Sequence, residues 1–381
     1  MTGQNPHQPA DRRSPIKVLI VEDSAVSRTL LIHILNADPA IRVIGAVASG
    51  EEALEAVARE RPDLITMDVQ LPGMNGFETT RAIMETHPVP IIIVTATCDM
   101  RQLETSFQAI DAGALAVLEK PILVGNRDYD QKRKELLTKV KLMSEIKVVR
   151  RWTRVGSKAV QAKRELGPDM ADRHHPVNIV AIGASTGGPP VIEKILSELP
   201  QNFTPPVLIV QHMAEGFIHG FVEWLGQSST LPVHVALHGS VARSGHVYVA
   251  PDGLQMKVEL SGRICCTDDG PENGLRPAIS YLFRSVAEVY GKNAIGVLLT
   301  GMGKDGAGEL KLMREKGAVT VAQNEETSAV FGMPGEAVRL EAARYVLPSD
   351  KIAAVLTSLA MIKAKKTTDS SEKEYGYGYG K

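Results

Sequence analysis

Short apolar runs rich in β-branched residues alternate with amphipathic stretches through the N-terminal third of this sequence. Two of these stretches, Val26–Leu35 and Glu51–Arg59, repeat their apolar residues at the spacing of a helix face. Strands that alternate with helices are typical of a parallel sheet covered by helices on both faces. The pattern therefore predicts one doubly wound domain with strands at Ile16–Val21, Arg42–Val47, Leu64–Met67, Ile91–Thr95 and Leu115–Leu118.

The same alternation restarts at Val177 and continues almost to the C-terminus. A Pro-Asp-Gly turn between Ser244 and Cys266 predicts β-hairpins inserted in this pattern. The fold class is therefore α/β, with a five-stranded doubly wound domain followed by a second doubly wound, mostly parallel α/β domain. In the second domain we expect strands at Val177–Ile182, Val207–Val210, Val233–Val235, Val247–Ala250, Ile295–Leu299 and Val319–Ala322. We expect helices at Pro190–Glu198, Gly216–Leu225, Pro277–Val289, Ala307–Lys316 and Pro334–Leu340.

A length of 381 residues suits two domains of ordinary size. No apolar run is long enough to span a bilayer, and residues 1–15 lack the apolar segment of a signal peptide. Cys98, Cys265 and Cys266 lack zinc or redox spacing, so we interpret them as packing residues. We therefore predict a cytoplasmic protein without membrane insertion. Its expected parts are a disordered leader (1–15), a first domain (16–140), a linker (141–175), a second domain (176–363) and a disordered tail (364–381).

Polar residues follow several predicted strands of the first domain. Glu22 and Asp23 follow the first strand, Asp68 follows the third, Thr95 ends the fourth and Lys120 follows the fifth. Because the carboxyl ends of parallel strands meet at one edge of a sheet, we expect these side chains to lie together. Clustered carboxylates bind Mg²⁺, and a carboxylate can accept a phosphoryl group as a nucleophile. A threonine hydroxyl and a lysine ammonium can contact that group.

The segments around these residues resemble those of two-component receiver domains. They are Val21-Glu22-Asp23, Met67-Asp68-Val69-Gln70-Leu71-Pro72-Gly73-Met74-Asn75-Gly76, Val94-Thr95-Ala96 and Glu119-Lys120-Pro121. The resemblance implies that Asp68 is phosphorylated by a histidine kinase and that Glu22, Asp23 and Asp68 hold Mg²⁺. Receivers often carry an aromatic switch residue three positions before the lysine, where this chain has Val117.

In the second domain, the first predicted strand leads into a glycine-rich turn, Gly183–Pro190, and then into a helix. Such a turn can bind phosphate, or it can present a serine beside N–H groups that stabilise an oxyanion. The turn alone favours neither use. His212 and Asp305 follow two other predicted strands. Together with Ser185 they are the parts of a catalytic triad, which is defined by geometry rather than by sequence order.

These segments resemble the catalytic domain of the CheB family, the chemotaxis protein-glutamate methylesterases. They are Ala181-Ile182-Gly183-Ala184-Ser185-Thr186-Gly187-Gly188-Pro189, Val210-Gln211-His212-Met213, Gly274-Leu275-Arg276-Pro277, Leu299-Thr300-Gly301-Met302-Gly303-Lys304-Asp305-Gly306 and Phe331-Gly332-Met333-Pro334-Gly335. The resemblance implies Ser185 as nucleophile, His212 as general base and Asp305 as the orienting carboxylate. It also implies that Thr186 and the backbone around Met302 hold the substrate carbonyl and its oxyanion.

The implied substrate is a glutamate methyl ester on the cytoplasmic helices of a chemoreceptor, and glutamine deamidation is a related reaction. The esterase reaction is expected to need no cofactor. We further expect the unphosphorylated receiver to cover the Ser185 cleft, and phosphorylation of Asp68 to weaken that contact.

Three alternatives remain open from the sequence. Receivers commonly control nucleic-acid binding, but a net charge of −1 and continued α/β alternation provide neither a basic face nor a recognition helix. A nucleotide-binding module would use the glycine loops at 183–188 and 301–306, and its binding of ATP or NAD would not depend on Ser185. An esterase that acts on another methylated protein would keep the same fold and triad.

Overall fold

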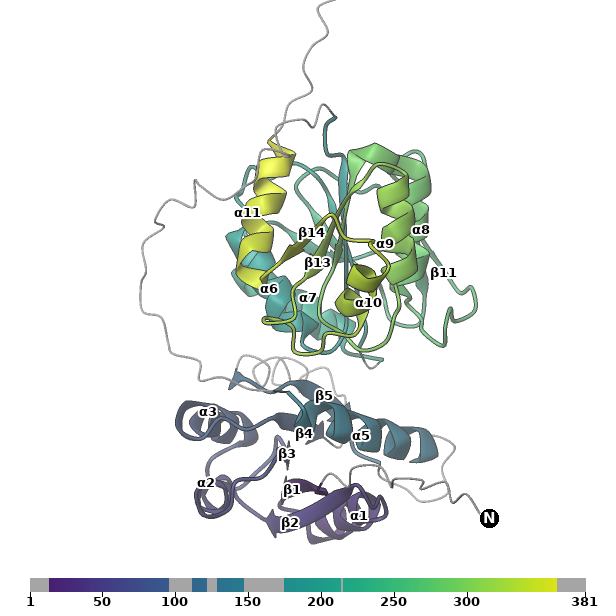
Figure 1. The fold of residues 1–381 in the computed structure, drawn as a ribbon. Helices are drawn as coiled ribbons and strands as arrows, with labels where there is room; N and C mark the ends of the chain where they lie inside the picture. Colours follow the sequence, from purple (N-terminus) through teal and green to yellow (C-terminus); the bar gives the residue numbers. More distant parts are fainter. Residues whose placement is uncertain (1–13, 96–111, 122–128, 147–174, 214, 362–381) are drawn as a thin grey trace, which may run out of the picture.

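The computed structural model describes residues 14–95, 112–121, 129–146, 175–213 and 215–361, which form two α/β domains (Figure 1). The N-terminal domain has a parallel five-stranded sheet in the order β2-β1-β3-β4-β5. Every residue of β3 and β4 is buried, as expected for strands covered on both faces. The strands are β1 (Ile16–Val21), β2 (Ile41–Val47), β3 (Leu64–Met67), β4 (Ile91–Thr95) and β5 (Ala116–Glu119).

Helices pack on both faces of this sheet. Apolar residues of α1 and α5 form a core on one face, and those of α2 and α3 form a core on the other. Helix α3 begins with a capping box, in which Asn75 accepts the N–H of Glu78 and Glu78 accepts the N–H of Asn75. The described helices are α1 (Ala25–Asn36), α2 (Gly50–Arg59), α3 (Gly76–Thr86) and α5 (Tyr129–Ser144).

The C-terminal domain is built on a parallel seven-stranded sheet in the order β14-β13-β12-β6-β7-β9-β8. β6 lies between β7 and β12. The strands that follow β6 directly in the chain are therefore added on its β7 side, and the later strands β12 to β14 are added on its other side. Parallel sheets bind ligands at the carboxyl end of such a switch point. The strands are β6 (Ile179–Ala184), β7 (Val207–Gln211), β8 (Val233–Val235), β9 (Val247–Val249), β12 (Ala294–Leu298), β13 (Val319–Gln323) and β14 (Tyr345–Leu347).

Two hydrophobic cores cover the faces of this sheet. One contains α6, α7 and α11, and the other contains α8, α9, α10 and the antiparallel hairpin of β10 and β11. The helices are α6 (Gly188–Glu198), α7 (Ile218–Ser228), α8 (Ile279–Tyr290), α9 (Ala307–Glu315), α10 (Met333–Arg339) and α11 (Ser349–Ala360), with a short 3-10 helix η2 (Gly291–Asn293). The hairpin strands are β10 (Gln255–Val258) and β11 (Ile264–Thr267).

The predicted fold class is confirmed, and the differences lie at element ends and near the C-terminus. β6 lies two residues later than the predicted strand at Val177–Ile182, and β14 and α11 were not predicted. Helix α5 continues through residue 140, so no break between elements lies there. Cys265 and Cys266 are buried and free. The tail, Cys98 and most of the leader and of the linker lie outside the described residues.

Candidate active site and phosphorylation site

Three carboxylates meet at the carboxyl edge of the N-terminal sheet. Glu22 and Asp23 follow β1, and Asp68 follows the neighbouring strand β3. One carboxylate oxygen from each residue lies within 4.8 Å of the others. Glu22 and Asp68 are buried, whereas Asp23 is exposed. Such a set of oxygen donors, with one side open to solvent, fits the coordination preferences of Mg²⁺.

Lys120, directly after β5, contacts two of these carboxylates. Its Nζ lies 2.8 Å from Glu22 Oε2 and 2.7 Å from Asp68 Oδ2. Burial opposes the charge on Lys120, but the bonds to Asp68 and Glu22 outweigh it and raise the pKa of the ammonium. Burial also raises the pKa of Glu22, although Lys120 opposes that shift. The ammonium therefore stabilises the negative charge of this cluster.

Thr95 lies at the same edge, as the last residue of β4. It is buried, and its carbonyl accepts the N–H of Lys120 at 2.7 Å. Among the described contacts, none joins its hydroxyl to Asp68. Its contact with a phosphoryl group therefore stays a prediction.

Ser185 follows β6, at the switch point of the C-terminal sheet. Its N–H donates to the Thr300 carbonyl at 3.0 Å, and its own carbonyl accepts the N–H of Gly188 at 2.9 Å. Gly187 in this turn has a φ of 75°, in the left-handed region that glycine adopts without strain. The chain therefore passes from strand to helix through a tight turn that carries the serine, which is 8% exposed.

His212 and Asp305 form a bonded pair across the end of β6. His212 follows β7, and its N–H donates to the Ala184 carbonyl at 2.9 Å. Asp305 comes from the loop after β12, on the opposite side of β6. His212 Nε2 lies 3.0 Å from Asp305 Oδ2. Within the described residues, no hydrogen bond joins the Ser185 hydroxyl to His212, so two of the three predicted residues are bonded and the third adjoins them.

Asp305 is held as an anion. Burial opposes its ionisation, but hydrogen bonds from His212, from Ser280 and from the N–H of Ile279 outweigh that effect and keep its pKa below the usual range. A charged carboxylate in this position can orient an imidazole and stabilise its protonated form.

Thr186 and the residue before Met302 both adjoin Ser185. Thr186 directly follows the serine in the chain. Met302 follows Gly301, where an added Cβ would lie only 2.6 Å from Ser185 Cβ. The N–H groups of Thr186 and Met302 donate to no other residue in the described part of the chain, so both are available as donors.

Two buried glutamines near Ser185 had no predicted role. Gln211 Nε2 donates to the carbonyls of Ser185 at 2.8 Å and His212 at 2.9 Å, which ties the two backbones together. Gln323 Oε1 accepts the N–H of Thr300 at 2.9 Å. Both glutamines end strands, so the criterion that identified His212, a polar residue at the carboxyl end of a strand, also applies to them.

The N-terminal domain contacts the C-terminal domain beside Ser185. Lys139 of α5 donates from Nζ to the Thr186 hydroxyl at 2.9 Å. Val117 of β5 packs against a core of the C-terminal domain, and Val330 packs against a core of the N-terminal domain. Figure 1 shows β5 and α5 on the side of the N-terminal domain that faces its neighbour. Burial lowers the pKa of the Lys139 ammonium.

Comparison with known proteins agrees with both predicted resemblances. The family model of the response regulator receiver domain matches residues 18–126, and that of the CheB methylesterase matches residues 180–356. The crystal structure of the Thermotoga maritima CheB methylesterase catalytic domain is 37% identical, covers 48% of this chain and 98% of that one, and has a TM-score of 0.46.

Among the described helices, none combines the length and apolar character needed to cross a membrane.

The relatives that match almost the entire chain include two that are more than half identical to it. The protein-glutamate methylesterase/protein-glutamine glutaminase 1 of Syntrophus aciditrophicus is 59% identical over 345 residues, which are 91% of this chain and 98% of that protein. The protein-glutamate methylesterase/protein-glutamine glutaminase of Nitrosospira multiformis is 56% identical over 344 residues, which are 90% of this chain and 97% of that protein. The chain therefore belongs to the CheB family and consists of a receiver domain followed by a methylesterase domain.

Proposed function

We propose that this chain is a protein-glutamate methylesterase that acts on the cytoplasmic helices of a chemoreceptor, with glutamine deamidation as a second reaction. The names of the two relatives described above include both activities, and the matches span nearly the whole chain. The observation that carries the proposal is the His212–Asp305 contact of 3.0 Å across the turn that holds Ser185. In serine hydrolases the general base is likewise hydrogen-bonded to an orienting carboxylate, there through Nδ1 and here through Nε2. The proposal places the protein in the cytoplasm, with its substrate.

In the proposed reaction, Ser185 Oγ attacks the ester carbonyl carbon while its proton passes to His212. Because Nε2 of His212 faces Asp305, Nδ1 is the nitrogen that takes this proton. The bond from carbon to the methoxy oxygen then breaks, His212 returns the proton, and methanol leaves a γ-glutamyl ester on Ser185. His212 next takes a proton from water, whose oxygen attacks the acyl carbon. The bond from the acyl carbon to Ser185 Oγ then breaks, and His212 returns the proton to Oγ, which restores the serine and frees the glutamate side chain as a carboxylic acid that ionises in water; with glutamine, ammonia leaves instead of methanol.

The negative charge that develops on the carbonyl oxygen needs hydrogen-bond donors. We assign this role to the N–H groups of Thr186 and Met302, which have no acceptor among the described residues. Donors fixed in advance by the backbone stabilise an oxyanion without having to reorganise.

Release of methanol from a methylated receptor tests the proposed reaction. We expect the full chain to release labelled methanol from a receptor fragment that carries labelled glutamate methyl esters. A methylated protein without receptor helices serves as the control substrate. Methanol release at only the rate seen without enzyme would contradict the esterase, and equal release from both substrates would contradict receptor specificity.

We propose that Asp68 of the receiver domain accepts a phosphoryl group from a histidine kinase. Glu22, Asp23 and Asp68 would hold Mg²⁺, which when bound supplies positive charge to the phosphoryl oxygens. Lys120 already neutralises part of the cluster through its contacts of 2.7 and 2.8 Å with Asp68 and Glu22. The N–H of Lys120 donates to the Thr95 carbonyl, which supports a role for Thr95 at the same edge of the sheet.

The contact between the domains supports regulation of the esterase by the receiver. The bond from Lys139 to Thr186 places α5 of the receiver against the residue next to the nucleophile. Val117, which occupies the position of the usual aromatic switch residue, also lies at this contact. We propose that the unphosphorylated receiver restricts access to Ser185 and that phosphorylation of Asp68 weakens the contact.

The Lys139→Met substitution should lower the activity of the unphosphorylated protein. The Lys139 ammonium is desolvated at the contact, so the wild-type contact includes an unfavourable burial of charge. Methionine keeps the length of the side chain without that charge. We expect about fivefold less methanol release before phosphorylation, corresponding to ~1 kcal/mol of tighter closure, and an unchanged maximum rate after it. Lys134→Met, at an exposed position of α5, is the matched control. Higher activity of the Lys139 variant before phosphorylation would show that the Lys139–Thr186 bond outweighs the cost of burial.

A further inference from the structure

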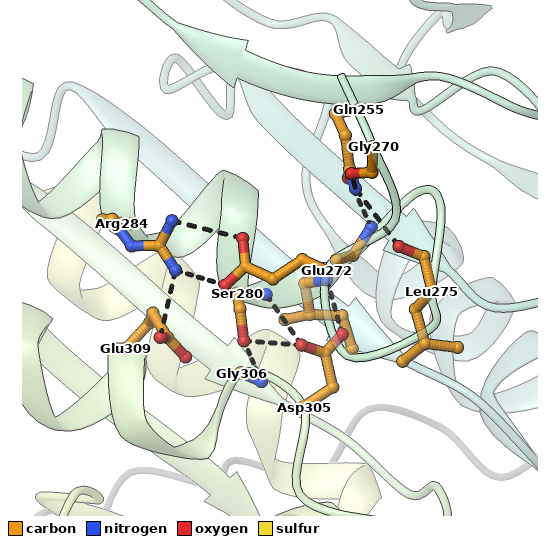
Figure 2. A network of polar contacts seen from close by, with 11 residues as sticks. Gln255, Gly270, Glu272, Leu275, Ser280, Arg284, Asp305, Gly306 and Glu309 are labelled. Carbon is orange, nitrogen blue, oxygen red and sulfur yellow. Dashed lines mark hydrogen bonds and ion pairs between the residues drawn. The ribbon is translucent and has the colours of Figure 1, made fainter. Parts of the chain in front are cut away.

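The Asp305 carboxylate lies against the N-terminus of helix α8, as Figure 2 shows. Oδ2 accepts the N–H of Ile279 at 2.7 Å, on the same oxygen that faces His212. Oδ1 accepts the N–H of Ser280 at 3.1 Å and the hydroxyl of Ser280 at 2.5 Å. Both oxygens are therefore held by the first turn of one helix.

This arrangement also satisfies the start of α8. The first N–H groups of a helix have no acceptors within it, and a polar N-cap side chain usually supplies one. The N-cap of α8 is Ala278, whose side chain cannot do so. Instead, Gln255 Oε1 accepts the N–H of Ala278 at 2.8 Å, and Asp305 accepts the next two. The positive end of the twelve-residue helix therefore faces the carboxylate.

The Ser280 hydroxyl is both a donor and an acceptor in this network. While it donates to Oδ1, its oxygen accepts the N–H of Gly306 at 3.0 Å. Gly306 follows Asp305 in the chain and packs closely on α8, since an added Cβ would lie 2.4 Å from Ile279 Cγ2. One hydroxyl thus ties the carboxylate of Asp305 to the backbone that follows it. Ser280 is 2% exposed, so water cannot readily replace it.

The loop before α8 is fixed in place by further polar contacts. Gln255 Nε2 donates to the carbonyls of Gly270 at 3.2 Å and Leu275 at 3.1 Å. Arg284 of α8 pairs with Glu272 of this loop and with Glu309 of α9 (Figure 2). The first turn of α8 is therefore a fixed support for Asp305.

From this geometry we infer that Ser280 is a positioning residue of the esterase, which orients the Asp305 carboxylate toward His212. The inference rests on the proposed function, because it concerns the same triad. Ser280 does not contact the reacting atoms and acts through Asp305. Without its hydroxyl, Oδ1 would keep one donor, the Gly306 N–H would have no acceptor, and the carboxylate could rotate away from His212.

The test is a double-mutant cycle in the full chain. We expect Ser280→Ala to lower kcat for methanol release about tenfold to a hundredfold, the effect of losing a hydrogen bond to a charged group, with little change in KM. In a chain that already carries Asp305→Asn, adding Ser280→Ala should produce no further loss, because the two residues act as one unit. Ser280→Thr keeps the hydroxyl and should restore most of the activity.

A pH profile adds a readout that a purely structural role would not change. Hydrogen bonds keep the pKa of Asp305 low, so removing one should raise that pKa. The Asp305 carboxyl of the Ser280→Ala enzyme should therefore take up its proton at a higher pH than that of the wild type, which a carbon-13 NMR titration of this carboxyl measures.

Ser285→Ala is the matched control, because Ser285 is a buried serine of the same helix that bonds to Leu282 and Val258 rather than to Asp305. It should lower the melting temperature and leave kcat and the pH profile unchanged. A wild-type kcat for Ser280→Ala, or equal losses with and without Asp305→Asn, would overturn the inference while leaving the esterase assignment intact. Absence of methanol release by the wild type would overturn the proposed function itself.

Discussion

Replacing Ser185 with alanine should lower kcat for methanol release by about 10⁶-fold, as loss of the nucleophile does in well-studied serine hydrolases. In the proposed reaction, the Ser185 hydroxyl supplies the oxygen that attacks the substrate and carries the acyl group. The turn should still form, because its bonds to Thr300, Gly188 and Gln211 use backbone groups of residue 185. The loss should therefore appear in kcat, with unchanged thermal unfolding.

Ser197→Ala on the following helix is the control for this substitution. Among the described residues, its hydroxyl bonds to the Lys194 carbonyl within α6 and to no group of the site, so its removal should leave kcat unchanged. If the Ser185→Ala protein retained more than about one-hundredth of the wild-type activity, Ser185 would not be the nucleophile, because residual catalysis from binding and oxyanion donors is far smaller. Binding of ATP or NAD that was unaffected by Ser185→Ala, in a chain without esterase activity, would favour a nucleotide-binding module.

Replacing Asp68 with asparagine should abolish phosphorylation of the receiver domain. An amide lacks the anionic oxygen that attacks the phosphoryl group, and it also loses the ion pair of 2.7 Å with Lys120. With a small-molecule phosphoryl donor and Mg²⁺, incorporation of phosphate should fall to background. The esterase activities measured with and without the donor should become equal.

Asp130→Asn is the matched control, because Asp130 is an exposed carboxylate at the start of α5. It should leave phosphorylation and activation unchanged. Continued phosphorylation of the Asp68→Asn protein would place the acceptor elsewhere. A protein that is phosphorylated normally but shows no change in esterase activity would keep Asp68 as acceptor and contradict the proposed regulation.

Residues at strand ends could be predicted because a parallel sheet has one carboxyl edge, whichever order its strands take. This rule placed Glu22 and Asp68 together, and it also placed His212 opposite Asp305. Short elements were harder to predict. β14 has only three residues, which is too few to show a period, and the buried residues of β6 continue to Ala184 without a change in pattern at Ile182.

The support of Asp305 could not be predicted from the sequence. Ser280 lies in the first turn of α8, 25 residues before Asp305, and their contact depends on how that helix packs against the loop after β12. The contact of Lys139 with Thr186 depends on how two domains meet, for which no local pattern exists. Both contacts arise from tertiary packing, whereas the His212–Asp305 pair and the acidic cluster follow from the carboxyl edge that the strands of each sheet share.

Covalent labelling with a fluorophosphonate tests the central claim most directly, because the reagent forms a stable bond only with an activated nucleophile. Attack by Ser185 Oγ displaces fluoride, and His212 takes the proton, as in the proposed ester reaction. We predict one adduct per chain, located on Ser185 by peptide mapping, formed faster after phosphorylation of Asp68 and much more slowly in the Asp305→Asn protein. An adduct on another residue, or no adduct in a protein that releases methanol, would contradict Ser185 as the nucleophile.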